Sequence, residues 1–164
     1  DFQKWRKAGV HKNSYFSDTK MGGGVIFELV HEINLINLLF GKIKKISTIK
    51  SNSKNFNCED VAISIVETEN NIIGSLYQDM FSKTFFRSIR IVTNKIFFEI
   101  DLVKNLIIEN NKIKNFKNIN KQTDLLRKNI LLFKKRIAKK DHSLDDYNIA
   151  LFDLDTCIKM HNAK

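Results

Sequence analysis

Apolar residues recur at helical spacing over residues 22–40 of the chain. They occupy positions 25, 26, 29, 30, 33, 36 and 39, a spacing that places side chains on one face of an α-helix. Gly41 directly follows the last of them and is a typical helix stop. The pattern therefore predicts a helix over residues 22–40.

Beyond Gly41 the apolar period shortens to about two residues, which is typical of β-strands. Asparagine-containing turns separate several of the runs, and connections this short allow only antiparallel neighbours, because a parallel return needs a long crossover. The pattern predicts one mostly antiparallel open sheet of about six strands. Its candidate strands are residues 42–50, 60–68, 72–80, 86–92, 96–101, 106–109 and 112–116.

Two further helices are predicted after the strands. The first covers residues 123–139, and the second begins after Ser143, a good N-cap, with Asp145 and Asp146 in its first turn. A helix, a run of strands and two closing helices indicate an α+β fold with the helices on one face of the sheet. We expect a single domain over residues 1–164, of which residues 1–21 form an irregular N-terminal segment.

The opposite face of this sheet also needs cover. Phe85-Phe86 and Phe97-Phe98 place large side chains on both sides of the predicted sheet. We therefore expect a partner subunit or domain there, with a homo-oligomer formed through the open face.

Composition narrows the class of protein. With 43% hydrophobic and 28% charged residues in 164, the chain has the make-up of a globular domain. Its longest uncharged apolar run, residues 33–40, is far shorter than the roughly 20 residues that cross a bilayer, so no membrane partner is expected. No leader follows Asp1, and Cys58 and Cys157 are expected to be free thiols in a reducing cytoplasm.

The formal charge of +10 raises the question of nucleic-acid binding. The positive residues are mostly lysine and are spread along the chain, with the densest group at 134–140 near the end of a predicted helix. A solvated face explains this distribution better than a phosphate-binding surface, and we expect no nucleic-acid partner. A basic binder that uses Trp5-Arg6 and Phe85-Phe86-Arg87 stays open as an alternative.

The predicted helix over residues 22–40 carries candidate chemistry. On a helix, Gly24, Glu28, His31 and Leu35 fall within an arc of about 60°. Glycine permits close approach of a ligand to the backbone, and a carboxylate three residues before a histidine can polarise its ring. This is a candidate acid or base beside a ligand. Alternatively, the glycines form a loop and His31 is satisfied by a nearby carbonyl.

The same segment resembles a known family. Residues 22–41 read GGGVIFELVHEINLINLLFG, which is similar to the pattern GGGVLxDLxHEIDxxxxLFG of the glucose-fructose oxidoreductase, inositol dehydrogenase and MocA (Gfo/Idh/MocA) family. Tyr15 precedes the glycines as in members reading SYSxxxxLGGG. Weaker similarities follow in order: EDVA at 59–62 to EDxA, NIIGSL at 71–76 to NGxxGSL, and SLDD at 143–146 to SxxDG.

The resemblance implies the C-terminal domain of an enzyme of this family, with a fold of the dihydrodipicolinate-reductase and GAPDH-like C-terminal type. In the complete enzyme an N-terminal Rossmann domain, missing here, binds NAD or NADP, and the substrate is a sugar, sugar derivative or cyclitol. His31 would exchange a proton with the substrate hydroxyl. The implied substrate-binding residues are Glu28, Asn34, Tyr15 and Arg6, and Gly23 and Gly24 would border the cofactor; no metal is implied.

The chain also departs from the family pattern. Glu28 and Asn34 both replace aspartate, and residues 92–95 lack the usual GxxGT turn. No GxGxxG or GxxxxGK[ST] motif occurs in the chain, so we expect it to bind no cofactor and to be inactive alone. A non-catalytic dimerisation or interaction module with the same fold is the alternative.

Overall fold

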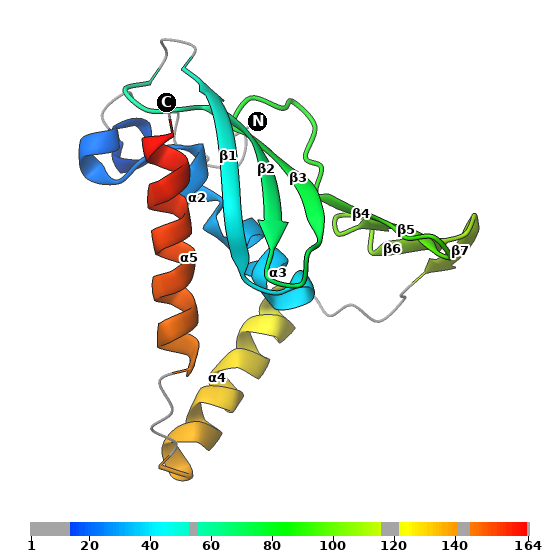
Figure 1. Cartoon of the computed structure of the whole chain (residues 1–164). Coiled ribbons are helices and arrows are strands. Elements are labelled where there is room, and N and C mark those ends of the chain that lie inside the picture. The colour runs from blue at the N-terminus through cyan, green and yellow to red at the C-terminus, as the bar shows by residue number, and fades with distance from the viewer. Residues whose placement is uncertain (1–13, 53–55, 116–121, 141–144, 164) are drawn as a thin grey trace. The chain divides into compact units, whose positions relative to one another are not determined.

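A computed structural model describes residues 14–52, 56–115, 122–140 and 145–163. Its helices and antiparallel sheets confirm the α+β class (Figure 1). The contacts divide the chain into two compact units, which we call unit 1 (Asp1–Lys83 and Leu144–Lys164) and unit 2 (Thr84–Ser143). The expectation of a single domain stays a prediction.

Unit 1 contains a three-stranded antiparallel sheet of order β1-β2-β3. Its strands lie within a residue or so of the predicted ranges. Ser143, the predicted N-cap of the last helix, lies outside the described residues. The elements are 3-10 helices η1 (Tyr15–Ser17) and η2 (Thr19–Met21), helices α2 (Val25–Glu28), α3 (Val30–Phe40) and α5 (Asp145–Asn162), and strands β1 (Ile43–Ser51), β2 (Val61–Thr68) and β3 (Ile73–Asp79).

Unit 2 holds the remaining strands in a second antiparallel sheet of order β4-β5-β6-β7. The prediction of one sheet was therefore wrong, although each predicted strand exists. The division falls after β3, where the Asp79 carboxylate accepts hydrogen bonds from the N–H groups of Phe81 and Ser82 and forms a turn instead of a further pairing. The elements are β4 (Ser88–Val92), β5 (Phe97–Asp101), β6 (Leu106–Glu109), β7 (Lys112–Asn115) and helix α4 (Gln122–Ala138).

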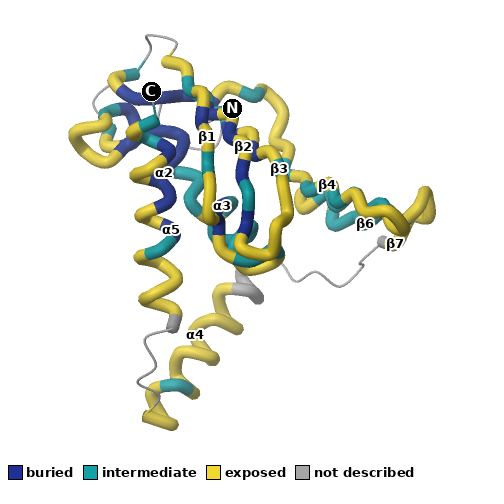
Figure 2. Tube along the Cα trace, in the orientation of Figure 1, coloured by how far each residue is buried: buried dark blue, intermediate teal, exposed yellow. Residues whose placement is uncertain are grey.

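The core of unit 1 lies between its sheet and its helices. Helices α2, α3 and α5 pack on one face of the sheet, and Figure 2 shows buried residues along α2, β2 and the C-terminal half of α5. Alternate residues of β2 point into this core, as a half-buried strand requires. The core consists of Val25, Ile26, Ile33, Ile43, Ala62, Val66, Leu76, Met80, Cys157 and Met160.

The predicted helix over residues 22–40 is broken. Leu29 separates α2 from α3 with φ −109° and ψ 31°, and segments Thr19–Glu28 and Val30–Phe40 are bent by 45°. The carbonyl of Leu29 accepts hydrogen bonds from the Glu32 N–H and from the buried Gln78 side chain, each at 3.1 Å. A side chain that enters the helical ladder is a usual cause of a bend. The sequence had predicted that Gly24, Glu28 and His31 share one straight helix face. Because of the bend, they do not.

The outer face of the unit 1 sheet exposes several large apolar side chains among polar ones. Ile49, Ile63 and Tyr77 pair across its three strands and are 78%, 48% and 52% exposed. Ile65 and Ile73, on the same face, are also exposed. An exposed apolar sheet face of this kind is typical of an interaction surface.

Within the described ranges no single helix is both long and apolar enough to cross a bilayer. Only the bent pair Thr19–Glu28 and Val30–Phe40, taken together, has sufficient length and apolar composition.

Candidate functional site

The three glycines form the turn that leads into α2. Gly22 ends η2 with φ 80°, in the left-handed region that favours glycine. A Cβ atom on Gly23 would lie 2.3 Å from the carbonyl oxygen of Tyr15, and one on Gly24 would lie 2.3 Å from Glu59 Oε1. The close approach that these glycines permit is therefore made by groups of the same chain.

The backbone N–H groups of this turn are also used internally. Gly23 N–H donates to the Asp18 carbonyl at 2.9 Å, and Gly24 N–H to the Phe16 carbonyl at 3.1 Å. Val25 N–H donates to the Glu59 carbonyl at 3.0 Å. A nucleotide-binding turn needs N–H groups directed at phosphate, so the residues of this turn do not fit such a cradle.

His31 lies at the start of α3, on its exposed side. Its side chain is 50% exposed, and Nε2 lies 3.2 Å from Glu32 Oε1. A purely structural histidine would be packed among core side chains. The imidazole of His31 is not. The carboxylate that contacts the imidazole belongs to Glu32. The sequence had predicted that Glu28 would polarise the ring. A neighbouring carboxylate can orient an imidazole for proton exchange with a ligand.

Asn34 lies one turn after His31 and faces α5. Its Nδ2 donates to Asp153 Oδ2 at 2.7 Å, and Asn37 Nδ2 donates to Asp153 Oδ1 at 2.6 Å. Asp153 is only 4% exposed. This contact explains why asparagine suits position 34 in this chain. An amide can donate a hydrogen bond to the buried carboxylate of Asp153, whereas an ionised aspartate cannot.

The other predicted substrate-binding residues lie apart from this contact. Tyr15 is 48% exposed and packs edge-on against Phe16, with ring centroids 5.9 Å apart. It adjoins Gly23, before the bend, while His31 follows the bend. Arg6 lies outside the described residues.

A buried polar pair escaped the sequence analysis. Glu59, 6% exposed, lies at the start of β2, and its Oε2 is 3.2 Å from Nδ1 of His161 in the last turn of α5. Lys50 Nζ donates to the carbonyl of His161, and the Phe27 ring lies 5.4 Å from the imidazole. The EDVA string marked Glu59 as a motif residue, but no local pattern links it to a histidine 102 positions away.

The cysteines are chemically quiet. Both Cys58 and Cys157 are free and buried, which confirms the expectation of free thiols. Burial, helped by the charges of Glu59 and Asp60, raises the pKa of Cys58 to about 11. Burial, helped by Asp153, raises the pKa of Cys157 to about 12. Neither thiol is suited to be a nucleophile at neutral pH.

No metal centre is evident where the structure is described. Those residues contain no group of three or more His, Cys, Asp or Glu side chains arranged to hold a metal ion. A shallow hollow lies on the outer sheet face, but none of the predicted site residues lines it.

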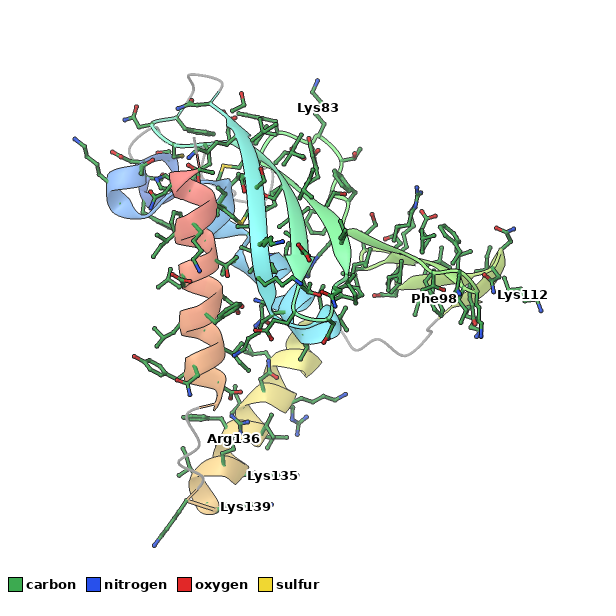
Figure 3. All side chains as sticks on the ribbon, viewed as in Figure 1. Lys83, Phe98, Lys112, Lys135, Arg136 and Lys139 are labelled. Carbon is green, nitrogen blue, oxygen red and sulfur yellow. The ribbon has the colours of Figure 1, made fainter. Side chains whose placement is uncertain are left out.

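The densest positive charge lies in unit 2. Lys135, Arg136 and Lys139 project from the last turns of α4 and the residue after it (Figure 3). Cations at a helix C-terminus offset the helix dipole, which agrees with the interpretation of a solvated face.

Comparison with known proteins identifies the family. An antiparallel sheet covered by helices on one face defines the class of fold. Residues 1–97 match the model of the GFO/IDH/MocA C-terminal domain, and the chain belongs to this family. No curated protein sequence matches it.

Three solved structures illustrate the similarity. UDP-N-acetylglucosamine 3-dehydrogenase from Acidithiobacillus ferrooxidans is 17% identical with a TM-score of 0.72, over 85% of this chain and 46% of that one. Levoglucosan dehydrogenase, in complex with NADH and levoglucosan, is 13% identical with a TM-score of 0.71, over 90% and 51%. Biliverdin reductase from Synechocystis, in complex with biliverdin and NADP+, is 11% identical with a TM-score of 0.67, over 90% and 49%. Identities this low establish the fold alone, and the chain spans about half the length of these proteins.

Proposed function

We propose that this chain is the substrate-binding and oligomerisation part of an NAD(P)-dependent oxidoreductase that acts on a sugar, a sugar derivative or a cyclitol. Membership of the GFO/IDH/MocA C-terminal domain family supports this reading. The observation that carries it is the exposed imidazole of His31, in the first turn of α3 and against Glu32.

The proposed role of His31 is proton exchange with a substrate hydroxyl. As the hydroxyl is oxidised to a carbonyl, Nδ1, the ring nitrogen that does not face Glu32, takes its proton, and in the reverse direction returns it. Glu32, 3.2 Å away, holds the ring and stabilises the imidazolium that forms. Glu28 and Tyr15 are proposed to contact other polar groups of the substrate. When bound, NAD or NADP supplies the hydride acceptor or donor.

The dinucleotide is proposed to be held outside this chain. The N–H groups of Gly23 and Gly24 are already paired within the glycine turn. Solved relatives whose names include NADH or NADP+ are about twice as long as this chain. We therefore expect the chain alone to bind no cofactor and to show no turnover.

The outer face of the unit 1 sheet is proposed to join two copies of the chain. Five exposed apolar residues lie on this face across three strands, interspersed with serines and the Lys45–Glu67 ion pair: Ile49, Ile63, Ile65, Ile73 and Tyr77. Burial of such a surface is favourable by about 25 cal/mol per Å².

Complementation tests the proposed function. The chain would be mixed with a Rossmann domain from a related oxidoreductase and assayed for NAD(P)-dependent oxidation of a panel of sugars. We expect turnover that His31→Ala reduces at least 100-fold, because general acid–base catalysis contributes about 10²–10⁴-fold. Leu38→Ala, an exposed change on the same helix, is the control and should retain activity. Turnover that survives His31→Ala would refute the role of this residue.

A non-catalytic module with the same fold is the second candidate. The amide of Asn34 is engaged by Asp153, and the recorded hollow lies away from His31, both of which favour a scaffold. Dimer formation together with no turnover in the complemented protein would support the scaffold.

A further inference from the structure

A buried carboxylate joins the helix that carries His31 to the last helix of the chain. Asp153 lies in α5, is 4% exposed and accepts one hydrogen bond on each oxygen. The donors are the side-chain amides of Asn34 and Asn37, which lie three residues apart on α3. We call these three side chains the Asp153 clamp.

The clamp reaches beyond the two helices. Asn37 Oδ1 accepts a hydrogen bond at 2.9 Å from the backbone N–H of Ile43, the first residue of β1. Both ends of the Asn37 amide are thus occupied, one by α5 and the other by the sheet. A substitution at Asp153 would therefore alter hydrogen bonds that hold both α3 and the start of β1.

Directional bonds add to a modest apolar contact in α3, in which Val30 and Ile36 are partly buried against the core. Ile33 is the only residue of this 11-residue helix that is fully buried. Apolar contacts set the rotation of a helix about its own axis only to within the width of its apolar face, whereas hydrogen bonds have preferred distances and angles. The N-terminal end of α3 is held by Gln78 at the Leu29 bend, and its next turns are held by Asp153.

We propose that Asp153 is a positioning residue for His31. Its carboxylate fixes the rotation of α3 through Asn34 and Asn37, and so fixes the direction in which the imidazole one turn earlier points. This inference rests on the proposed function for its catalytic meaning, but the clamp itself is testable without turnover. It assigns Asn34 to the positioning of α3, in place of a contact with substrate.

The polarity of the clamp can be exchanged. Asn34→Asp alone would set two carboxylates about 2.7 Å apart, the distance now spanned by the hydrogen bond. Asp153→Asn alone would leave one oxygen to accept from two amides. In the double variant the new amide at 153 can donate to the new carboxylate at 34 and accept from Asn37, so every bond is restored.

Thermal unfolding of the full chain measures the coupling. Each single variant is expected to lower Tm by about 4 °C or more, since a hydrogen bond to a buried charge is lost. The exchange variant is expected to recover at least half of the summed loss. Asp155→Asn is the control, because Asp155 is exposed and pairs with Lys159 within α5. An exchange variant no more stable than the sum of its parts would show that the clamp does not form.

NMR signals of the His31 ring separate positioning from packing. Each single variant should shift these signals, the exchange variant should return them towards the wild-type position, and Asp155→Asn should leave them in place. Lower stability with unmoved His31 signals would overturn the positioning role. If these shifts occur but the complemented protein shows no His31-dependent turnover, the clamp stands and the proposed function fails.

Discussion

At the scale of single residues, the glycine turn is shaped by the chain's own carboxylate. Gly24 adopts φ 121° and ψ 153°, a region nearly confined to glycine, and lies against Glu59, which also meets His161. One buried side chain thus links the turn, the start of β2 and the end of α5. From sequence alone, the glycine motif suggests close approach by a ligand. In the fold, the Glu59 side chain occupies the space beside Gly24.

The glycine turn predicts unequal effects of alanine. Gly24→Ala is expected to destabilise the chain by about 3 kcal/mol, since it combines backbone strain with displacement of Glu59. Gly22→Ala, where φ is 80° but no atom lies within 4 Å, should cost about 1 kcal/mol. Urea unfolding measures both. Equal losses at the two positions would show that Glu59 does not occupy the space beside Gly24.

The buried thiols predict slow chemistry. With pKa values raised to about 11 for Cys58 and about 12 for Cys157, very little thiolate forms at pH 8, and burial hinders access as well. A thiol-reactive disulfide reagent should therefore label neither cysteine quickly in the folded chain and both in urea. Rapid labelling of the folded chain would contradict the described core.

The sequence indicated which residues are notable, but it did not predict which side chains they contact. The motif marked Glu28, His31 and Asn34 as notable, but Glu32 is the carboxylate against His31, and Asn34 faces α5. The deciding partners, Asp153 and Gln78, lie far along the chain. Local spacing cannot reveal contacts that only the tertiary fold creates.

At the scale of elements, strands were predicted more accurately than the first helix. Alternating apolar residues and asparagine turns are local signals, and Asn71, Asn105, Asn110 and Asn111 do adopt positive φ in the structure. The bend at Leu29 depends on a hydrogen bond from Gln78, which lies 49 residues away. The split into two sheets likewise depends on a turn at Asp79, which the alternation did not mark.

The turn at Asp79 predicts an acid-sensitive junction. Burial opposes ionisation of this carboxyl, but hydrogen bonds from Ser82 and Phe81 outweigh it and hold the pKa below its ordinary value of 3.8. The ionised form is therefore favoured by folding, and its contribution is present above pH 3.8 and lost as the pH falls through the lowered pKa. Asp79→Asn should be less stable than wild type near neutral pH, and the difference should shrink on acidification. A difference that stays constant down to pH 2 in urea unfolding would contradict this account.

At the scale of the whole molecule, the chain presents one covered and one open sheet face in unit 1. Helices α2, α3 and α5 cover the inner face, where the core residues lie, and the outer face exposes several large apolar side chains. The proposed function needs a substrate wall on the helical side of the sheet and an oligomer contact on the other side. One covered face and one open face agree with this need. The substrate wall was expected from the resemblance, whereas the oligomer contact was predicted from Phe85-Phe86 and Phe97-Phe98, which lie in unit 2 and not on the unit 1 sheet.

The open face predicts a change of assembly. Ile65→Lys, at a position 62% exposed, should convert a dimer to a monomer without loss of folding, because a charge would be buried in the contact. Light scattering coupled to gel filtration measures the mass. Asn148→Lys, an exposed change on helix α5, serves as the charge-matched control. A wild-type chain that is monomeric at high concentration would remove the proposed contact.

A crystal structure of the complemented protein with a bound sugar tests the central claim most directly. The account predicts that Nδ1 of His31 lies at hydrogen-bond distance, about 3 Å, from the hydroxyl that is oxidised, with Glu32 still against Nε2. A sugar bound elsewhere, with His31 facing bulk solvent, would contradict the account and leave the chain a scaffold.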